Sequence, residues 1–140
     1  MLHMDPDEFE KACPFALDPF QREAIELLSA GRSVLVAAPT GSGKTVVAEY
    51  ALESARSAGG GFFYTAPLKA LSNQKYRDLC RAISPAEVGL LTGDNSINGD
   101  ANVVVMTTEV LRNMIYEGSS RLDDLEVVVL AEIERQQLPA

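Results

Sequence analysis

The glycine-rich segment at residues 38–45 (APTGSGKT) contains the residue types that bind phosphate. Glycines let backbone N–H groups turn inward and approach phosphate oxygens. A helix that starts at such a loop adds the positive end of its dipole. The ammonium of Lys44 can reach nucleotide β- and γ-phosphates, and the hydroxyl of Thr45 can bind Mg²⁺. The predicted phosphate-binding residues are Ala38, Pro39, Thr40, Gly41, Ser42, Gly43, Lys44 and Thr45.

Two other interpretations of this segment are weaker. A glycine turn that only connects a strand to a helix is one, but a lysine in the first helical turn is unfavourable unless an anion lies there. A dinucleotide-binding loop is the other, but Val46 stands where that loop has its third glycine. The first position is Ala38 rather than the glycine of the strict phosphate-binding pattern.

Hydrophobic patterning predicts the strand and helix that position this loop. Residues 33–37 (SVLVA) form a short apolar run, which is typical of a strand buried on both faces, and a helical pattern follows over residues 44–58. Further strands are predicted at residues 62–65, 87–91, 102–106 and 126–130, and further helices at residues 68–82 and 107–116. Strands that alternate with helices indicate an α/β fold with a parallel sheet and flanking helices.

Two aspartate–proline pairs near the N-terminus predict helix starts. Asp5 and Asp18 are suitable N-caps, and each is followed by a proline that fits the first helical position. Glu8 and Gln21 stand three residues after these caps, as in a capping box. Gly31 is expected to end the second helix.

Composition excludes several function classes. The 140 residues are 46% apolar and 23% charged, ordinary values for a globular chain, and no apolar run approaches the roughly 20 residues of a membrane span. Cys13 and Cys80 lack metal-type spacing and predict free thiols in a reducing cytoplasm. His3 is the only histidine, which argues against histidine metal sites and Ser-His-Asp catalysis.

The net charge of −8 argues against a nonspecific nucleic-acid binder, because such proteins are usually basic. The distribution of charge is uneven, however. No acid lies between Glu53 and Asp78, whereas this stretch carries Arg56, Lys69, Lys75 and Arg77. One local segment is therefore basic within an acidic chain.

An ordered set of motifs resembles the superfamily 2 helicases. Residues 38–45 resemble the family's first motif, residues 15–21 its adenine-contacting Q-type motif and residues 128–130 the strand before motif II. The segments that resemble its nucleic-acid motifs are residues 65–71, 92–94 and 106–109. The strongest resemblance is to the superkiller-like DExH-box RNA helicases, including actinobacterial members, and it covers residues 13–134.

The resemblance implies a RecA-like ATP-binding domain that hydrolyses ATP with Mg²⁺ and acts on RNA or, alternatively, DNA. It implies that Gln21 contacts adenine, although the same glutamine could simply complete a capping box. The residues implied to contact the nucleic-acid backbone are Pro67, Leu68, Lys69, Thr92, Gly93, Asp94, Thr107 and Thr108. Backbone contacts of this kind need few basic residues, which reconciles RNA binding with the acidic balance.

Each of the three nucleic-acid segments also has a purely structural interpretation. Residues 67–69 could form only a strand-to-helix turn, and residues 92–94 could form a plain turn. Thr107 and Thr108 are ordinary N-cap residues. The basic local segment and the order of the motifs favour the functional interpretation.

The chain departs from the family pattern at motif II. The family has Asp-Glu-x-His there, and this chain has Ala131-Glu132-Ile133-Glu134. Glu132 is expected to orient the attacking water, but the aspartate that holds Mg²⁺ is missing. We therefore expect weak or absent catalysis. A natural degenerate fragment and an erroneous or frameshifted last ten residues both explain the departure, and a deliberately altered regulatory protein is a third explanation.

The expected organisation is an N-terminal segment (1–12), a partial first RecA-like domain (13–134) and an unmatched tail (135–140). The strand that carries motif III would follow residue 140, so we expect a gap inside the sheet. Two other function classes remain open. One is a nucleotide- or RNA-binding remnant, or a domain completed by another polypeptide that supplies the second RecA-like domain; the other is a different phosphate-binding-loop NTPase, such as a transporter or kinase subunit.

Overall fold

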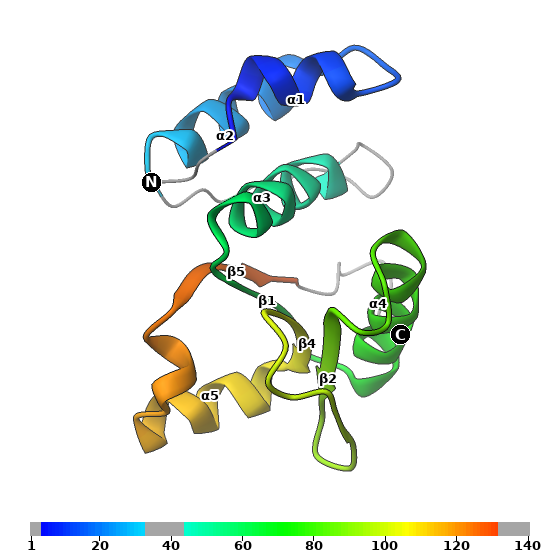
Figure 1. The fold of residues 1–140 in the computed structure, drawn as a ribbon, viewed down its shortest axis with the longest axis vertical. Helices are drawn as coiled ribbons and strands as arrows, with labels where there is room; N and C mark the ends of the chain where they lie inside the picture. The colour runs from blue at the N-terminus through cyan, green and yellow to red at the C-terminus, as the bar shows by residue number, and fades with distance from the viewer. Residues whose placement is uncertain (1–3, 33–43, 132–140) are drawn as a thin grey trace, which may run out of the picture. The chain divides into compact units, whose positions relative to one another are not determined.

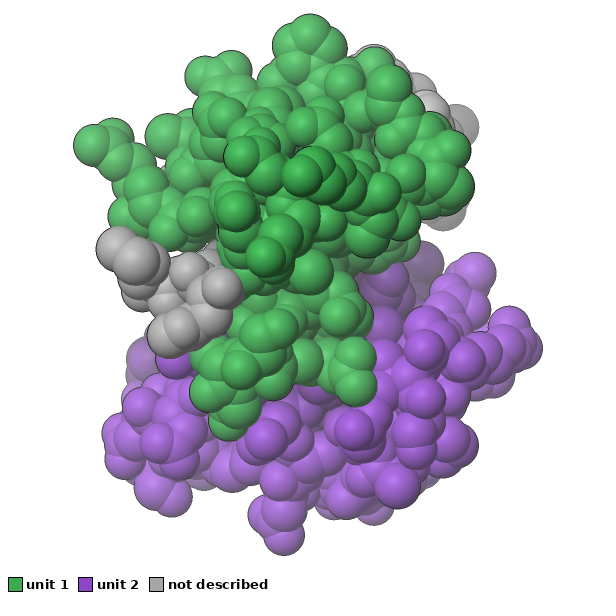
Figure 2. Space-filling model, turned by 45° about the horizontal axis from the view of Figure 1, so that its top comes forward, with its two compact units in different colours: residues 1–59 green, residues 60–140 purple. Residues whose placement is uncertain are grey.

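The computed structural model describes residues 4–32 and 44–131. The chain forms two compact units, residues 1–59 and residues 60–140, which Figure 2 shows in different colours. The predicted strand at residues 33–37 and most of the predicted phosphate-binding loop lie outside the described residues. Both cysteines, Cys13 and Cys80, are free thiols, as predicted.

The described part of the first unit is helical. Its helices are α1 (Pro6–Ala12), α2 (Pro19–Ser29) and α3 (Lys44–Ala58) (Figure 1). Both predicted helix starts are confirmed. The Asp5 carboxylate accepts a 3.1 Å hydrogen bond from the N–H of Asp7, and Asp18 forms a capping box with Gln21.

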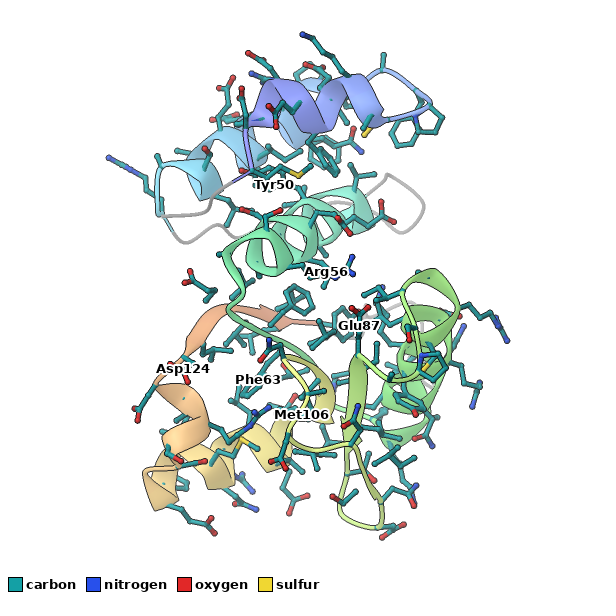
Figure 3. The ribbon with its side chains drawn as sticks, in the orientation of Figure 1. Tyr50, Arg56, Phe63, Glu87, Met106 and Asp124 are labelled. Carbon is teal, nitrogen blue, oxygen red and sulfur yellow. The ribbon has the colours of Figure 1, made fainter. Side chains whose placement is uncertain are left out.

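A small apolar core holds these helices together. Phe9 of α1, Ile25 of α2, and Val46 and Tyr50 of α3 are all buried in it (Tyr50 is labelled in Figure 3). The rings of Phe9 and Tyr50 meet edge to face, 5.3 Å apart, and the Tyr50 hydroxyl donates a 2.6 Å hydrogen bond to the carbonyl of Met4. The N-terminal segment therefore shares one core with α2 and α3.

The second unit is built on a five-stranded sheet with the order β3-β2-β4-β1-β5. The strands are β1 (Gly61–Ala66), β2 (Val88–Leu91), β3 (Ser96–Ile97), β4 (Val103–Thr107) and β5 (Leu125–Leu130). All neighbouring pairs are parallel except β2 and β3. The four strands predicted in this part of the chain and the α/β fold are confirmed, whereas the short antiparallel β3 was not predicted.

Helices α4 (Lys69–Ala82) and α5 (Thr108–Glu117), with the 3₁₀ turn Ser120–Leu122, complete the second unit (Figure 1). Leu111 of α5 packs with Phe63, Val104 and Met106. On α4, the ammonium of Lys75 lies 5.0 Å from the centre of the Tyr64 ring. Because Phe63 and Tyr64 are consecutive in β1, their side chains point to opposite faces, so α5 and α4 cover opposite faces of the sheet.

β5 is the outer strand of the described sheet, where it pairs with β1. Its residues alternate between half-buried and exposed, and Val128 and Leu130 are among the exposed apolar residues of the described chain.

Within residues 4–32 and 44–131, no helix is both long and apolar enough to cross a membrane.

Candidate functional site

The three segments that resemble nucleic-acid motifs lie at one edge of the sheet. Residues 65–71 and 106–109 begin in the last two residues of β1 and β4, and residues 92–94 follow β2. These strands are parallel neighbours in the order β2-β4-β1. Ala66 pairs with Thr107 in the register of β1 and β4, and Leu91 pairs with Met106 in that of β2 and β4. The segments that begin at Pro67, Thr92 and Thr107 therefore leave the sheet side by side, at the edge where α/β proteins commonly bind ligands.

The first segment leads directly into α4. Leu68 is the N-cap with an extended backbone, and its side chain cannot cap the N–H groups of the first turn. Ser72, one turn later, is fully buried; its hydroxyl lies 3.2 Å from the Leu68 carbonyl oxygen and 3.4 Å from that of Met106. This contact fixes the start of α4 against the end of β4.

The second segment is a tight turn after β2. The N–H of Thr92 donates to the carbonyl of Asn95 at 2.9 Å, and the N–H of Asn95 donates to the Thr92 hydroxyl at 3.1 Å. Thr92 is buried, whereas Gly93 and Asp94 are exposed. A side chain at Gly93 would meet no atom within 4 Å, so the tip of the turn faces open space.

The third segment starts α5. Thr107 ends β4 and is the N-cap of α5, and within the described residues its side chain makes no capping hydrogen bond. Thr108 is exposed at the first helical position. The N-termini of two helices, α4 and α5, thus lie at neighbouring strand ends, and both have first-turn N–H groups that no side chain caps in the described structure.

Two of the predicted nucleic-acid residues contact each other. The ammonium of Lys69 forms an ion pair with the carboxylate of Asp94. The hydrogen bond from Lys69 and its opposite charge hold the pKa of the Asp94 carboxyl below its ordinary value. The carboxylate stays charged at neutral pH. It balances the ammonium of Lys69, which the resemblance implies contacts the nucleic-acid backbone.

The predicted nucleotide residues are placed less completely. Gln21 is 3% exposed, and its Oε1 accepts a 2.8 Å hydrogen bond from the N–H of Asp18, so the structural role in the capping box is observed. Lys44 and Thr45 begin α3, as predicted. Residues 38–43 and the predicted catalytic Glu132 lie outside the described residues. In the described part of the chain, no cluster of His, Cys, Asp and Glu could hold a metal ion.

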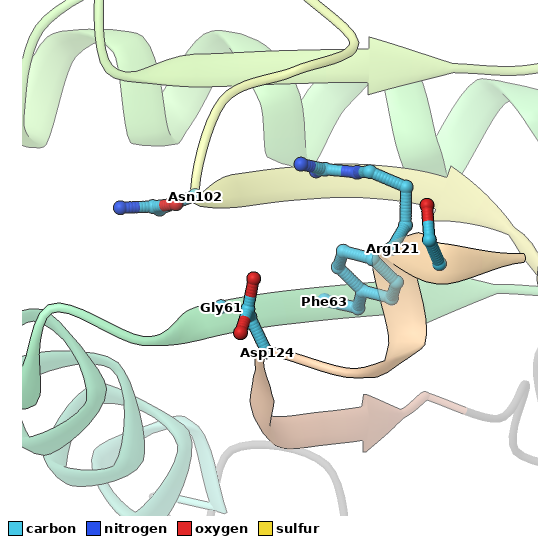
Figure 4. Close-up of a pocket in the computed structure, with 6 residues that line it drawn as sticks. Gly61, Phe63, Asn102, Arg121 and Asp124 are labelled. Carbon is cyan, nitrogen blue, oxygen red and sulfur yellow. The ribbon is translucent and has the colours of Figure 1, made fainter.

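The opposite edge of the sheet carries a small pocket of about 180 Å³ that the sequence did not indicate (Figure 4). It is lined by residues at the amino ends of the strands, including Gly61, Asn102 and Asp124. Arg121 reaches over it, 5.7 Å from the centre of the Phe63 ring, and donates hydrogen bonds to two backbone carbonyls. Arg121 therefore connects the 3₁₀ turn Ser120–Leu122 to residues 100–101, which precede β4. The pocket is remote from the carboxyl ends of β1, β2 and β4.

Comparison with known proteins decides the family. The DEAD/DEAH box helicase family matches residues 18–137, most of the chain. The chain belongs to the DEAD/DEAH box helicase family. The resemblance to superfamily 2 helicases and the RecA-like fold class inferred from sequence are therefore confirmed.

Relatives in this helicase family come from bacteria and eukaryotes. The chain is 58% identical, over 89% of its length, to the probable helicase HelY of Mycobacterium leprae. It is 50% identical over 88% of its length to the antiviral helicase SKI2 of Saccharomyces cerevisiae, and 47% identical over 94% to the ATP-dependent RNA helicase mtr4 of Schizosaccharomyces pombe. The chain spans only 14%, 10% and 12% of these relatives, respectively.

Proposed function

We propose that the chain is the N-terminal, ATP-binding part of an ATP-dependent DExH-type RNA helicase, and that its sheet edge binds the RNA backbone. The main support is the convergence of residues 67–69, 92–94 and 107–108 at three neighbouring strand ends. Two uncapped helix N-termini at this edge offer N–H donors to phosphate oxygens. Two relatives, which are 48% and 47% identical to this chain, are named ATP-dependent RNA helicases.

Nucleotide binding is assigned to the first unit on sequence grounds. Lys44 and the loop before it would hold the phosphates, Thr45 would bind Mg²⁺, and Gln21 would contact adenine. Bound Mg²⁺ would neutralise charge that develops on the β- and γ-phosphates. Glu132 would orient the attacking water.

Hydrolysis by this chain is expected to be weak. Ala131 follows β5 at the position where the family has the Mg²⁺-holding aspartate, and its N–H donates a 2.8 Å hydrogen bond to the carbonyl of Thr65. The methyl side chain of alanine has no atom that can bind a metal or its water ligands. This observation favours a second candidate function, a nucleotide- or RNA-binding remnant without catalysis.

Titration of the full chain with fluorescent ATP and with single-stranded RNA, each with and without Mg²⁺, tests the proposal. We expect RNA binding, and ATP binding that Lys44→Ala abolishes. Binding that is equal with and without Mg²⁺, together with no RNA-stimulated phosphate release, would favour the remnant. Robust RNA-stimulated ATPase activity that is lost in Lys44→Ala would overturn the expectation of weak catalysis, and failure to bind RNA would overturn the assignment of the sheet edge.

A further inference from the structure

The ion pair between Lys69 and Asp94 crosses the proposed RNA-binding edge. Lys69 is the first residue of α4, which follows β1, and Asp94 lies in the turn that follows β2. β4 lies between β1 and β2 in the sheet. The pair therefore connects the segments on either side of the strand end that carries Thr107.

Lys69 occupies a position where a nearby anion is stabilising. The N-terminus of a helix carries partial positive charge, so a lysine at the first helical position is unfavourable on its own. The first turn of α4 contains no acid that could balance this charge. Asp94 provides the missing anion, 25 residues further along the chain.

The turn that presents Asp94 is well defined, whereas the carboxylate itself is free to exchange partners. The two hydrogen bonds between Thr92 and Asn95 fix the turn, and Thr92 is buried. The side chain of Asp94 is 71% exposed and that of Lys69 is 46% exposed. The ion pair can therefore open without any change in the fold around it.

A carboxylate and a phosphodiester offer a lysine the same chemistry, a pair of oxygens that share one negative charge. We propose that Asp94 acts as an internal substitute for an RNA phosphate on Lys69, and that this competition limits how tightly the edge binds single-stranded RNA. The inference rests on the proposed function, since it needs RNA at this edge. The carboxylate of Asp94 then tunes affinity through Lys69 and does not itself bind RNA, so a contact between this residue and RNA would come from its backbone.

The test is a fluorescence-anisotropy titration of the full chain with a short labelled oligouridylate over a range of salt concentrations. We expect Asp94→Asn to tighten binding by about twofold to fivefold, the range in which an exposed ion pair acts. The slope of log K against log salt should steepen by up to about 0.7, because Lys69 then contributes a full phosphate contact to a single strand. Asp94→Glu, which keeps the carboxylate, should bind like the unmodified chain.

Two further variants show whether the effect passes through Lys69. Lys69→Gln should weaken binding more in the Asp94→Asn background than in the unmodified chain. Asp100→Asn is the matched control, since it changes the net charge equally; Asp100 is exposed, and Arg121 contacts its backbone carbonyl. We expect Asp100→Asn to leave affinity nearly unchanged.

Each alternative outcome is informative. Equal affinity gains in Asp94→Asn and Asp100→Asn, weaker binding in Asp94→Asn, or no coupling between positions 69 and 94 would overturn the inference while leaving the proposed function standing. RNA binding by none of the variants would overturn the proposed function as well. Cooperative thermal unfolding close to that of the original chain checks that the variants keep the fold and alter only the exposed pair.

Discussion

The hydroxyl of Thr65 donates a 3.0 Å hydrogen bond to the carbonyl of Val129. Thr65 lies in β1 and is fully buried, and Val129 lies in β5. Two residues after Val129, the N–H of Ala131 donates to the carbonyl of the same Thr65 at 2.8 Å. The carboxyl end of β1, which leads to the proposed RNA contacts, is thus joined to the end of β5, which leads to the altered motif II.

Thr65→Val should lower the free energy of unfolding of the second unit by about 1–2 kcal/mol, because it removes a hydrogen bond at almost constant volume. Urea unfolding followed by circular dichroism measures this change. Thr108→Val, the same substitution at an exposed position, is the control and should stay within about 0.5 kcal/mol of the original chain. Equal effects of the two substitutions would contradict the role given to Thr65.

Tyr50→Phe should loosen the N-terminal segment. The variant keeps the ring that meets Phe9 but loses the hydrogen bond to the carbonyl of Met4, at a cost of about 1 kcal/mol. Amide hydrogen exchange should show faster exchange in α1. Tyr116→Phe removes the same hydroxyl from an exposed residue of α5 and should change nothing. Unaltered protection of α1 in Tyr50→Phe would show that the hydrogen bond does not hold this segment.

Substitutions at Gln21 can separate its capping role from the proposed adenine contact. Glutamate keeps the oxygen that accepts from the N–H of Asp18, but it lacks the amide donor that adenine would need. We expect Gln21→Glu to preserve helix stability and to weaken ATP binding by about tenfold, the effect of losing one hydrogen bond. Gln21→Ala should reduce both stability and ATP affinity. ATP affinity unchanged in Gln21→Glu would leave only the structural role.

The pKa of Asp94 should respond to Lys69. Lys69 lowers this pKa in the folded chain, so the ion pair favours folding at pH values above the ordinary aspartate pKa, and this contribution is lost as the pH falls through the lowered value. Carboxyl NMR titration should find the Asp94 pKa below its ordinary value in the original chain. In Lys69→Gln, the Asp94 pKa should be higher and closer to its ordinary value. An identical pKa in both proteins would show that the pair does not persist in solution.

Local patterns allowed much of the fold to be predicted. The apolar pattern predicted a strand at residues 102–106, where β4 lies, and the first four residues of β4 are buried. The pairs Asp5–Pro6 and Asp18–Pro19 predicted the starts of α1 and α2. These features depend on residues close together in the chain, which is why periodicity and capping chemistry reveal them.

Features that depend on sheet order could not be predicted in the same way. β3 has only two residues, both exposed, so it leaves no hydrophobic pattern. Lys69 and Asp94 were each proposed to contact RNA, but their pairing follows from the order β2-β4-β1, which the sequence did not specify. The burial of Phe9 against Tyr50 likewise needs the packing of α1 and α3.

Chemical-shift mapping of the full chain with single-stranded RNA would show directly whether this edge of the sheet binds RNA. We expect the amide signals of residues 67–69, 92–94 and 107–108 to shift together during the titration. Signals at the amino ends of the strands, such as those of Gly61, Asn102 and Asp124, should stay unchanged. Shifts confined to the amino ends, or no shifts at RNA concentrations that saturate a related helicase, would contradict the assignment of this sheet edge to RNA.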